Sequence, residues 1–500
     1  MVRTSLFLVL IAGVAFLAAD ISITTFDPWF ELKRMAIGMV TPDFFSLPAF
    51  GRALFNTISF ALIGIAGAVV LGFGLSLFFD YTPVRLFCAF IRAIHELFWA
   101  FIFMPIIGLN SFCGILAIAI PYAGVFAKVY AEIRQESDQR PTEALQLGTP
   151  RATAFFYTTL PLIYRDLKNY TSYRFECALR SSAILGFIGL PTLGYHLETA
   201  FREGMYSEAA ALLYCFYLLI LSLRFWARPR LILFPLIVAF IFTNWDASVS
   251  LVNIMRFFTY DILPWPLRAE GFYDGSQVVS LHPVQLFEWL KNILINDALP
   301  GIWNTVLLTQ IVLVCTAAFT LLIFPLASRK FFSRKVTGWA HIVLIVVRTT
   351  PEYILAYIIL QICGPSMLPA IIALSLHNGG ILAYLTACNV NLMQLPFDSP
   401  HLRINRYFYE VLPRCYGQFL AFLFYRWEVI MRESAILGIL GIYTLGHFID
   451  SAISEDQLDR ALILIIISAF LNMGIDTLSQ RIRKSLHISA HFVARSSSSS

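Results

Sequence analysis

Long apolar stretches alternate with short charged segments along the whole chain. Residues 53–79 and 298–328, for example, contain no charged side chain. An α-helix rises about 1.5 Å per residue, so about 20 apolar residues cross the hydrocarbon core of a bilayer. Each of these stretches is therefore long enough to span a membrane as a helix.

The same test, applied along the chain, predicts about twelve membrane-spanning segments. They cover residues 5–23, 53–79, 93–109, 112–130, 176–196, 207–223, 231–245, 302–327, 340–362, 367–388, 428–448 and 461–478. Backbone polar groups in lipid must be paired within the protein, and these segments lack the two-residue alternation of a barrel wall. We therefore predict an all-α, polytopic integral membrane protein.

Composition supports the membrane interpretation. Of the 500 residues, 58% are hydrophobic and 13% are charged, with a mean hydropathy of +0.72, which is too apolar for an ordinary soluble domain or for disorder. The eight cysteines are scattered without a C-x-x-C pair, a pattern typical of buried hydrophobic positions rather than of disulfides or metal ligands. The net charge of +5 is weak evidence for nucleic acid, and we expect no nucleic-acid partner.

The short basic loops predict the orientation. Arg and Lys cluster in residues 224–230, 329–335 and 481–484, and such loops remain in the cytoplasm by the positive-inside rule. Residues 24–50 and 246–300 then face the other side of the membrane. Both chain ends are expected in the cytoplasm.

The two terminal segments carry separate expectations. The apolar opening of the chain ends near Ala18 and Ala19, so it fits either a cleaved signal peptide or an uncleaved anchor. We favour the anchor, because the corresponding run of the second half, residues 231–245, lies in the middle of the chain. The serine-rich end, residues 487–500, is expected to be disordered.

The chain contains an internal repeat. Residues 173–194 and 425–446 are identical at 13 of 22 positions without a gap. Weaker matches pair residues 92–103 with 348–359 and residues 55–64 with 303–312. We predict two repeats, residues 1–228 and 229–500, that share one orientation. Parallel repeats imply a pseudo-twofold axis along the membrane normal and a transport pathway between the halves.

A long mixed-charge loop, residues 131–172, is expected to contact a cytoplasmic partner. Pro141 predicts the start of a short helix and Gly148 its end, because glycine favours the turn after a helix. A second apolar helix follows and is expected to stop at Pro161. Two short helices joined at a glycine form a knob that can enter a groove on another protein.

This loop resembles a known signature. Glu143-Ala144, then Gly148, then Leu160-Pro161 are similar to the E-A-A-x3-G-x9-I-x-L-P motif of ABC importer permeases. Residues 92–103, 114–132 and 173–189 look like the permease of phosphonate uptake systems.

The resemblance implies the fold and partners of a type I importer. Its permeases bind two cytoplasmic ATPase subunits, here at residues 131–172 and 389–424, and an extracytoplasmic substrate-binding protein. It implies a bacterial inner-membrane protein that moves phosphonate or a related small phosphorus oxyanion. ATP and Mg²⁺ would serve the ATPase subunits, and this chain would bind no cofactor.

The sequence departs from the family motif in both halves. Glu143 stands one residue closer to Gly148 than the motif requires, which rotates its side chain by about 100° on a helix. The second half keeps Leu412 and Pro413 but has no Glu-Ala pair and no matching glycine; its basic residues are Arg403, Arg406 and Arg414. Two interpretations are open. Either an ATPase subunit docks at this loop through shape and basic side chains, or the two ATPase contacts differ in strength.

Each copy of the repeat carries a charged pair. Glu176 and Arg180 are four residues apart, as are Glu428 and Arg432, so each pair lies on one helical face in the favourable order. Charges at this depth serve as membrane-edge anchors or line a polar pathway. If the cargo is anionic, the two arginines are candidates for the pathway.

Small residues follow each pair. Ser182 and Ser434 are further pathway candidates, although close helix packing alone explains small residues at these positions. The family usually continues G-A-G-G-I-G, whereas this chain has GLPTLG and GIYTLG and keeps the outer glycines only.

A further pair recurs at the predicted start of another helix. Arg92 and Glu96 correspond to Arg348 and Glu352. A helix start is favoured over contact with cargo, because Pro351 precedes an acid placed at the positive end of the helix dipole.

Motifs of enzymes and ATPases are missing from the sequence. There is no G-x-x-x-x-G-K-[ST], H-E-x-x-H or G-x-S-x-G stretch, so we expect a transport subunit that is not an enzyme and has no metal site. The alternative is a secondary transporter driven by an ion gradient, which should show unpaired intramembrane acids. A membrane scaffold is a third possibility.

Overall fold

The computed structural model describes residues 2–45, 49–138, 140–146, 148–228, 231–245, 250–268, 283–395 and 402–486. The regular elements of this part of the chain are all helices, which confirms the predicted fold class. The predicted disordered tail, residues 487–500, lies outside the described residues.

Six helices are long and apolar enough to cross a bilayer, and three bent helix pairs raise the total to nine. The six candidate spans are Phe50–Leu77, Ser111–Glu136, Tyr206–Leu223, Pro283–Ile323, Met367–Leu392 and Leu458–Ser485. Two shorter apolar helices, α1 (Val2–Ala18) and α12 (Leu233–Phe242), add to these. The chain is a multi-pass membrane protein, while the number twelve stays a prediction.

One compact unit comprises residues Phe30–Phe287 and Asp456–Ala469. Its centre is α6 (Ser111–Glu136), which packs against α3 (Phe50–Leu77), α4 (Thr82–Ala93), α5 (Glu96–Ile107) and α9 (Leu160–Ile184). The other helices of this unit are α2 (Pro28–Val40), α7 (Arg140–Glu143), α8 (Arg151–Ala154), α10 (Leu193–Arg202), α11 (Tyr206–Trp226), α12 and α13 (Leu251–Arg256). Small residues bring α3 and α6 together: a Cβ on Gly72 would lie 2.6 Å from the Cβ of Phe126.

The other unit comprises residues Met1–Trp29, Glu288–Glu455 and Phe470–Ser500. Here α18 (Met367–Leu392) is central and packs against α15 (Leu299–Ile323), α16 (Arg334–Thr349), α17 (Glu352–Cys363) and α20 (Leu412–Glu433). The unit also contains α1, α19 (Arg403–Asn405) and α21 (Leu445–Ser454), while α14 (Pro283–Asn292) and α22 (Leu458–Ser485) extend across the unit boundaries. The packing order of the first unit is thus repeated.

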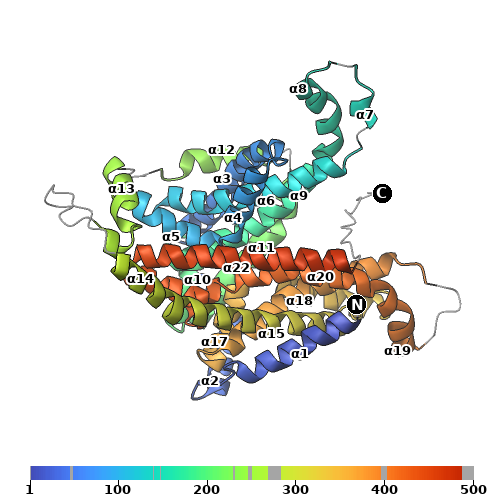
Figure 1. Ribbon diagram of the computed structural model, residues 1–500. Coiled ribbons are helices and arrows are strands. Elements are labelled where there is room, and N and C mark those ends of the chain that lie inside the picture. Colours follow the sequence, from blue (N-terminus) through green and yellow to red (C-terminus); the bar gives the residue numbers. More distant parts are fainter. Residues whose placement is uncertain are drawn as a thin grey trace. The chain divides into compact units, whose positions relative to one another are not determined.

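The compact units do not follow the two halves of the sequence. Helix α1 packs against α15 of the second half (Figure 1), and Ser5 hydrogen-bonds the Tyr416 hydroxyl at 2.6 Å. Conversely, α12, near the start of the second half, packs against α3 of the first. Each unit therefore contains a helix from the other half of the chain.

Two predicted spans, residues 93–109 and 340–362, are bent rather than straight. Helices α4 and α5 meet at 92°, and so do α16 and α17. The residues that precede α5 and α17, His95 and Pro351, have extended backbone angles (ψ 145° and 142°), which cannot continue an α-helix.

The bend separates the two members of each helix-start pair. Glu96 and Glu352 begin α5 and α17, whereas Arg92 and Arg348 lie in the last turn of the preceding helix. The members of each pair therefore sit on different helices, and the four-residue spacing does not place them on one helical face.

The duplicated stretch forms the same helix break twice. After α9, a 3-10 turn (Leu185–Ile188) leads to Gly189, whose φ is +93°, before α10 begins. After α20, the turn Ile436–Leu440 leads to Gly441 at φ +80°, before α21. Left-handed φ values favour glycine. The predicted spans 176–196 and 428–448 are thus interrupted where the sequences are most alike.

Backbone groups freed at each break find partners on a neighbouring helix. The Leu193 N–H donates to the Thr57 hydroxyl of α3 at 2.9 Å, and the Leu445 N–H donates to the Thr305 hydroxyl of α15 at 2.9 Å. In the first half, the buried Ser182 hydroxyl also donates to the Thr57 carbonyl at 2.8 Å. A buried N–H without a partner is costly, so these hydroxyls hold the breaks in place.

Glycine is also required where the chain folds back on itself. A Cβ on Gly194 would lie 1.8 Å from the Ala183 carbonyl oxygen, and one on Gly446 would lie 1.8 Å from that of Ala435. No side chain fits at such distances without moving the backbone. The last glycine of GLPTLG and the last glycine of GIYTLG thus have a packing role, whereas the first glycine of each serves the left-handed turn.

We expect Gly194→Ala and Gly446→Ala each to lower the melting temperature of the detergent-solubilised protein, because overpacking costs about 1–3 kcal/mol. The matched control is Gly74→Ala in α3, where an added Cβ meets no atom within 4 Å. That control should leave the melting temperature unchanged or higher. Equal stability of Gly194→Ala and Gly74→Ala would contradict the close approach.

We expect Thr57→Val and Thr305→Val to destabilise the fold by about 1–3 kcal/mol each, because each leaves a buried N–H unpaired. Thr199→Val is the control, since the exposed Thr199 hydroxyl bonds only within its own helix, to the Tyr195 carbonyl at 2.9 Å. Thermal unfolding followed by tryptophan fluorescence measures the difference. The same small effect for all three variants would argue against the capping role.

Candidate coupling and translocation elements

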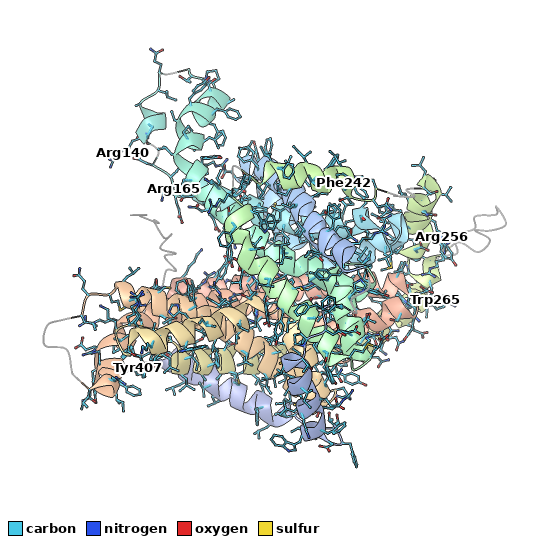
Figure 2. The ribbon with its side chains drawn as sticks, turned by 180° about the vertical axis from the view of Figure 1, so that it is seen from behind. Arg140, Arg165, Phe242, Arg256, Trp265 and Tyr407 are labelled. Carbon is cyan, nitrogen blue, oxygen red and sulfur yellow. The ribbon has the colours of Figure 1, made fainter. Side chains whose placement is uncertain are left out.

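The first candidate coupling segment projects from its unit. Between α6 and α9, the short helices α7 and α8 stand away from the other helices of the unit (Figure 1), and Figure 2 labels Arg140 on this segment. Glu143, Ala144 and Gly148 are all exposed. Gly148 has φ +97°, and a Cβ added there would meet no atom within 4 Å, so this glycine serves the backbone turn and not packing.

The helix after this segment does not stop at Pro161, contrary to the prediction. A π-helical turn, Phe155–Thr159, precedes α9, and the Leu160 N–H bonds the Phe155 carbonyl five residues back. Pro161 follows directly after this widened turn, which accommodates the proline. The helix therefore runs from the coupling segment to Ile184.

The second half contains the same device. The π-helical turn Arg406–Val411 precedes α20, the Leu412 N–H bonds the Tyr407 carbonyl, and Pro413 lies in the first turn. Leu-Pro in each half thus marks a widened turn that continues into a long helix.

The basic residues of the second candidate coupling segment contact their own unit. Arg406 donates to the Lys330 carbonyl at 2.9 Å, and the Arg403 guanidinium lies 4.8 Å from the centre of the Phe332 ring. Tyr407 donates to the Leu321 carbonyl at 3.0 Å, and burial raises the pKa of its phenol to about 12. This segment, which Figure 2 marks at Tyr407, is anchored to the turn between α15 and α16. Residues 396–401 of the predicted loop lie outside the described part of the chain.

The charged pairs occupy single helices, as their spacing predicts. Glu176 and Arg180 are half-buried on α9, and Glu428 and Arg432 are half-buried on α20. An Arg180 Nη2 lies 3.3 Å from the Cys177 sulfur.

The two candidate serines are fully buried. The Ser182 hydroxyl donates within α9 as well as to Thr57, and the Ser434 hydroxyl donates to the Met431 carbonyl at 2.7 Å. Their contacts are those of helix packing, and a role in the pathway stays a prediction.

The first half contains a buried polar junction that the sequence did not predict. The Ser181 hydroxyl donates to Glu96 Oε1 at 2.5 Å and lies 3.1 Å from the Tyr122 hydroxyl. Helices α5, α6 and α9 meet at this point. The carboxylate at the start of α5 is thereby tied to the helix that carries the duplicated stretch.

The second half places different side chains at the corresponding positions. Glu352 begins α17 as Glu96 begins α5, and Asn378 is the twelfth residue of α18 as Tyr122 is of α6. Glu433 aligns with Ser181 in the duplicated stretch. The Asn378 amide donates to Glu433 Oε2 at 3.0 Å.

His377 completes this second junction. Its Nε2 lies 3.8 Å from Glu352 Oε2. One difference between the two copies of the repeated stretch could have identified this junction. The first copy has the neutral Ser181 where the second copy has the charged Glu433.

Comparison with known proteins finds relatives along most of the chain. The chain is 26% identical over 428 residues to the phosphate-import permease protein PhnE of Mycolicibacterium smegmatis, covering 80% of this chain and 77% of that protein. It is 27% identical over 195 residues to the phosphite transport system permease protein PtxC of Stutzerimonas stutzeri, covering 37% of this chain and 70% of that protein. A putative phosphite permease of the same organism, HtxC, is 28% identical over 178 residues, 34% of this chain and 63% of its own length.

No family model matches the chain, and no solved structure matches it. The relatives are transport permeases rather than enzymes. With its apolar helices, the chain is a multi-pass membrane protein and a homologue of the permease proteins of phosphonate, phosphite and phosphate transport systems.

Proposed function

We propose that this chain is the permease subunit of an ATP-driven importer that moves phosphonate or a related phosphorus oxyanion across the bacterial inner membrane. The observation that carries the proposal is the similarity over 80% of the chain to a phosphate-import permease. The all-helical membrane fold and the exposed segment of α7 and α8 agree with it.

The chain is proposed to combine two permease repeats, residues 1–228 and 229–500. Thr57 and Thr305 cap the same break in each half, and Gly194 and Gly446 make the same close approach. The phosphite permease matches 37% of this chain but 70% of itself, so it is about half as long. A single chain would then supply what two copies of such a relative supply.

ATP-binding subunits are the proposed source of energy. The chain lacks the G-x-x-x-x-G-K-[ST] motif, and the exposed segment around Gly148 is the proposed site of one ATPase subunit. The second subunit would contact residues 389–424, where Arg403 and Arg406 are held against their own unit and contribute shape rather than free charge.

The proposed orientation follows the basic loops and places both chain ends in the cytoplasm. An extracytoplasmic binding protein would deliver cargo on the other side, to residues 24–50 and 246–300. ATP-driven closure of the ATPase subunits would then move α9 and α20, because each coupling segment continues without interruption into its helix. An ion-gradient-driven transporter is not favoured, since the relatives are permeases of import systems.

We expect Gly148→Asp and Glu143→Lys to reduce substrate-stimulated ATP hydrolysis in the assembled complex by about fivefold or more, the range of typical coupling energies. Glu143→Lys should hardly change the melting temperature of the isolated permease, because Glu143 is exposed. Gly148→Asp should lower it slightly, because Gly148 has φ +97°, a backbone angle that favours glycine. Gly51→Asp is the control: Gly51 is exposed, and a Cβ there meets no atom within 4 Å. Unchanged stimulation in both coupling variants would count against this segment as the ATPase contact.

We expect Arg180→Gln and Arg432→Gln to slow uptake of a labelled phosphorus oxyanion by about tenfold, which corresponds to ~1.4 kcal/mol on the barrier. The reason is the loss of a positive charge from each helix that carries the break. Arg165→Gln is the control on the exposed part of α9. Uptake at the wild-type rate by the double variant would show that neither arginine contributes to the pathway.

A further inference from the structure

The buried junction of the second half has one more carboxylate than that of the first half. In the first half, one carboxylate, Glu96, accepts a hydrogen bond from the neutral Ser181 hydroxyl. In the second half, two carboxylates, Glu352 and Glu433, and the imidazole of His377 place ligand atoms within 4.8 Å of one another. Like charges at such a distance repel strongly where water is scarce.

The orientation of His377 is that of a metal-binding imidazole. Its Nδ1 lies 2.9 Å from the Thr350 carbonyl oxygen, which can only accept, so Nδ1 carries the proton. The Nε2 then faces Glu352 Oε2, 3.8 Å away, so either a proton or a metal ion on this nitrogen would attract the carboxylate. Metal-bound histidines commonly donate their other N–H to a backbone carbonyl in this way.

A third observation comes from Asn378. This side chain is fully buried, and its amide reaches into the junction by donating to Glu433 Oε2 at 3.0 Å. Among the described residues, its Oδ1 has no hydrogen-bond partner. A buried amide oxygen without a donor is costly, and amide oxygens are common ligands for hard cations.

We propose that Glu352, His377 and Glu433 bind a divalent transition-metal ion such as Zn²⁺ or Mn²⁺, with the Asn378 Oδ1 as the fourth ligand. Metal–ligand bonds of about 2.0–2.2 Å separate neighbouring ligand atoms by about 3–4 Å, so the side chains need only small rotations from their present positions. Glu352 and His377 are 7% and 1% exposed, so the ion would be shielded from water.

The proposed ion would join three helices. Glu352 opens α17, His377 lies on α18, and Glu433 ends α20 next to the helix break. In the first half, the hydrogen bonds of Glu96, Ser181 and Tyr122 make the equivalent connection without a metal. The two halves would thus hold the same junction by different chemistry.

Metal content is the test, and it needs neither an ATPase nor transport. Full-length protein is purified without metal-affinity resin, stripped with EDTA, equilibrated with Zn²⁺ or Mn²⁺, desalted and analysed by mass spectrometry of the metal. We expect one tightly held equivalent per chain in the wild type and a higher melting temperature with the ion than without it.

Three variants make the result specific. Glu433→Ser introduces the residue that the first half has at this position, so it should fold, and it should lose the bound ion and the metal-dependent rise in melting temperature. His377→Gln should lose both as well. The control Glu96→Gln, in the first-half junction, should keep both.

Either of two results would overturn the proposal. The first is a wild-type chain that retains no ion and shows no metal-dependent change in melting temperature, which would mean that a proton alone separates the carboxylates. The second is equal metal content in the wild type, Glu433→Ser and His377→Gln, which would mean binding elsewhere.

Discussion

The structure depends on pairing the backbone groups that are freed where helices break in an apolar environment. At two places a long helix ends in a 3-10 turn, passes through a left-handed glycine and restarts. In lipid, an unpaired N–H or carbonyl group costs several kcal/mol. Thr57 and Thr305 supply the missing partners, and Gly194 and Gly446 let the restarted helix lie against the previous one. These requirements explain why the chain repeats this stretch so closely.

Much of the fold could be predicted from the sequence, because apolar length and repeated residues report directly on membrane helices. The all-α class and the duplicated stretch follow from such patterns. Bends were missed, since hydropathy does not distinguish one straight helix from two joined at His95 or Pro351. The predicted helix end at Pro161 was wrong for a related reason. A widened π-helical turn accommodates a proline that a regular α-helix would not.

The candidate site was harder to predict, because its polar residues meet through tertiary packing. Spacing within one helix identified Glu176 with Arg180, but it could not show that Glu96 and Ser181 meet across 85 residues. For the same reason, the sequence did not predict that Glu352, His377 and Glu433, which come from three helices, lie close together. A difference between repeats was the informative signal, since a charge appears at Glu433 where the other copy has serine.

The compact units show that the two halves depend on each other. Helix α1 belongs with the helices of the second half, and α12 belongs with those of the first. A cut of the chain after residue 228 would therefore separate each unit from one of its helices. The halves also differ in detail: the segment of α7 and α8 projects, whereas the segment before α20 is anchored through Arg403, Arg406 and Tyr407.

The most direct test of the account is uptake into liposomes that contain the purified chain with or without its ATPase subunits. A labelled phosphorus oxyanion is expected to accumulate only when the ATPase subunits, ATP and the binding protein are all present. Accumulation by the chain alone, driven by a proton or sodium gradient, would contradict it.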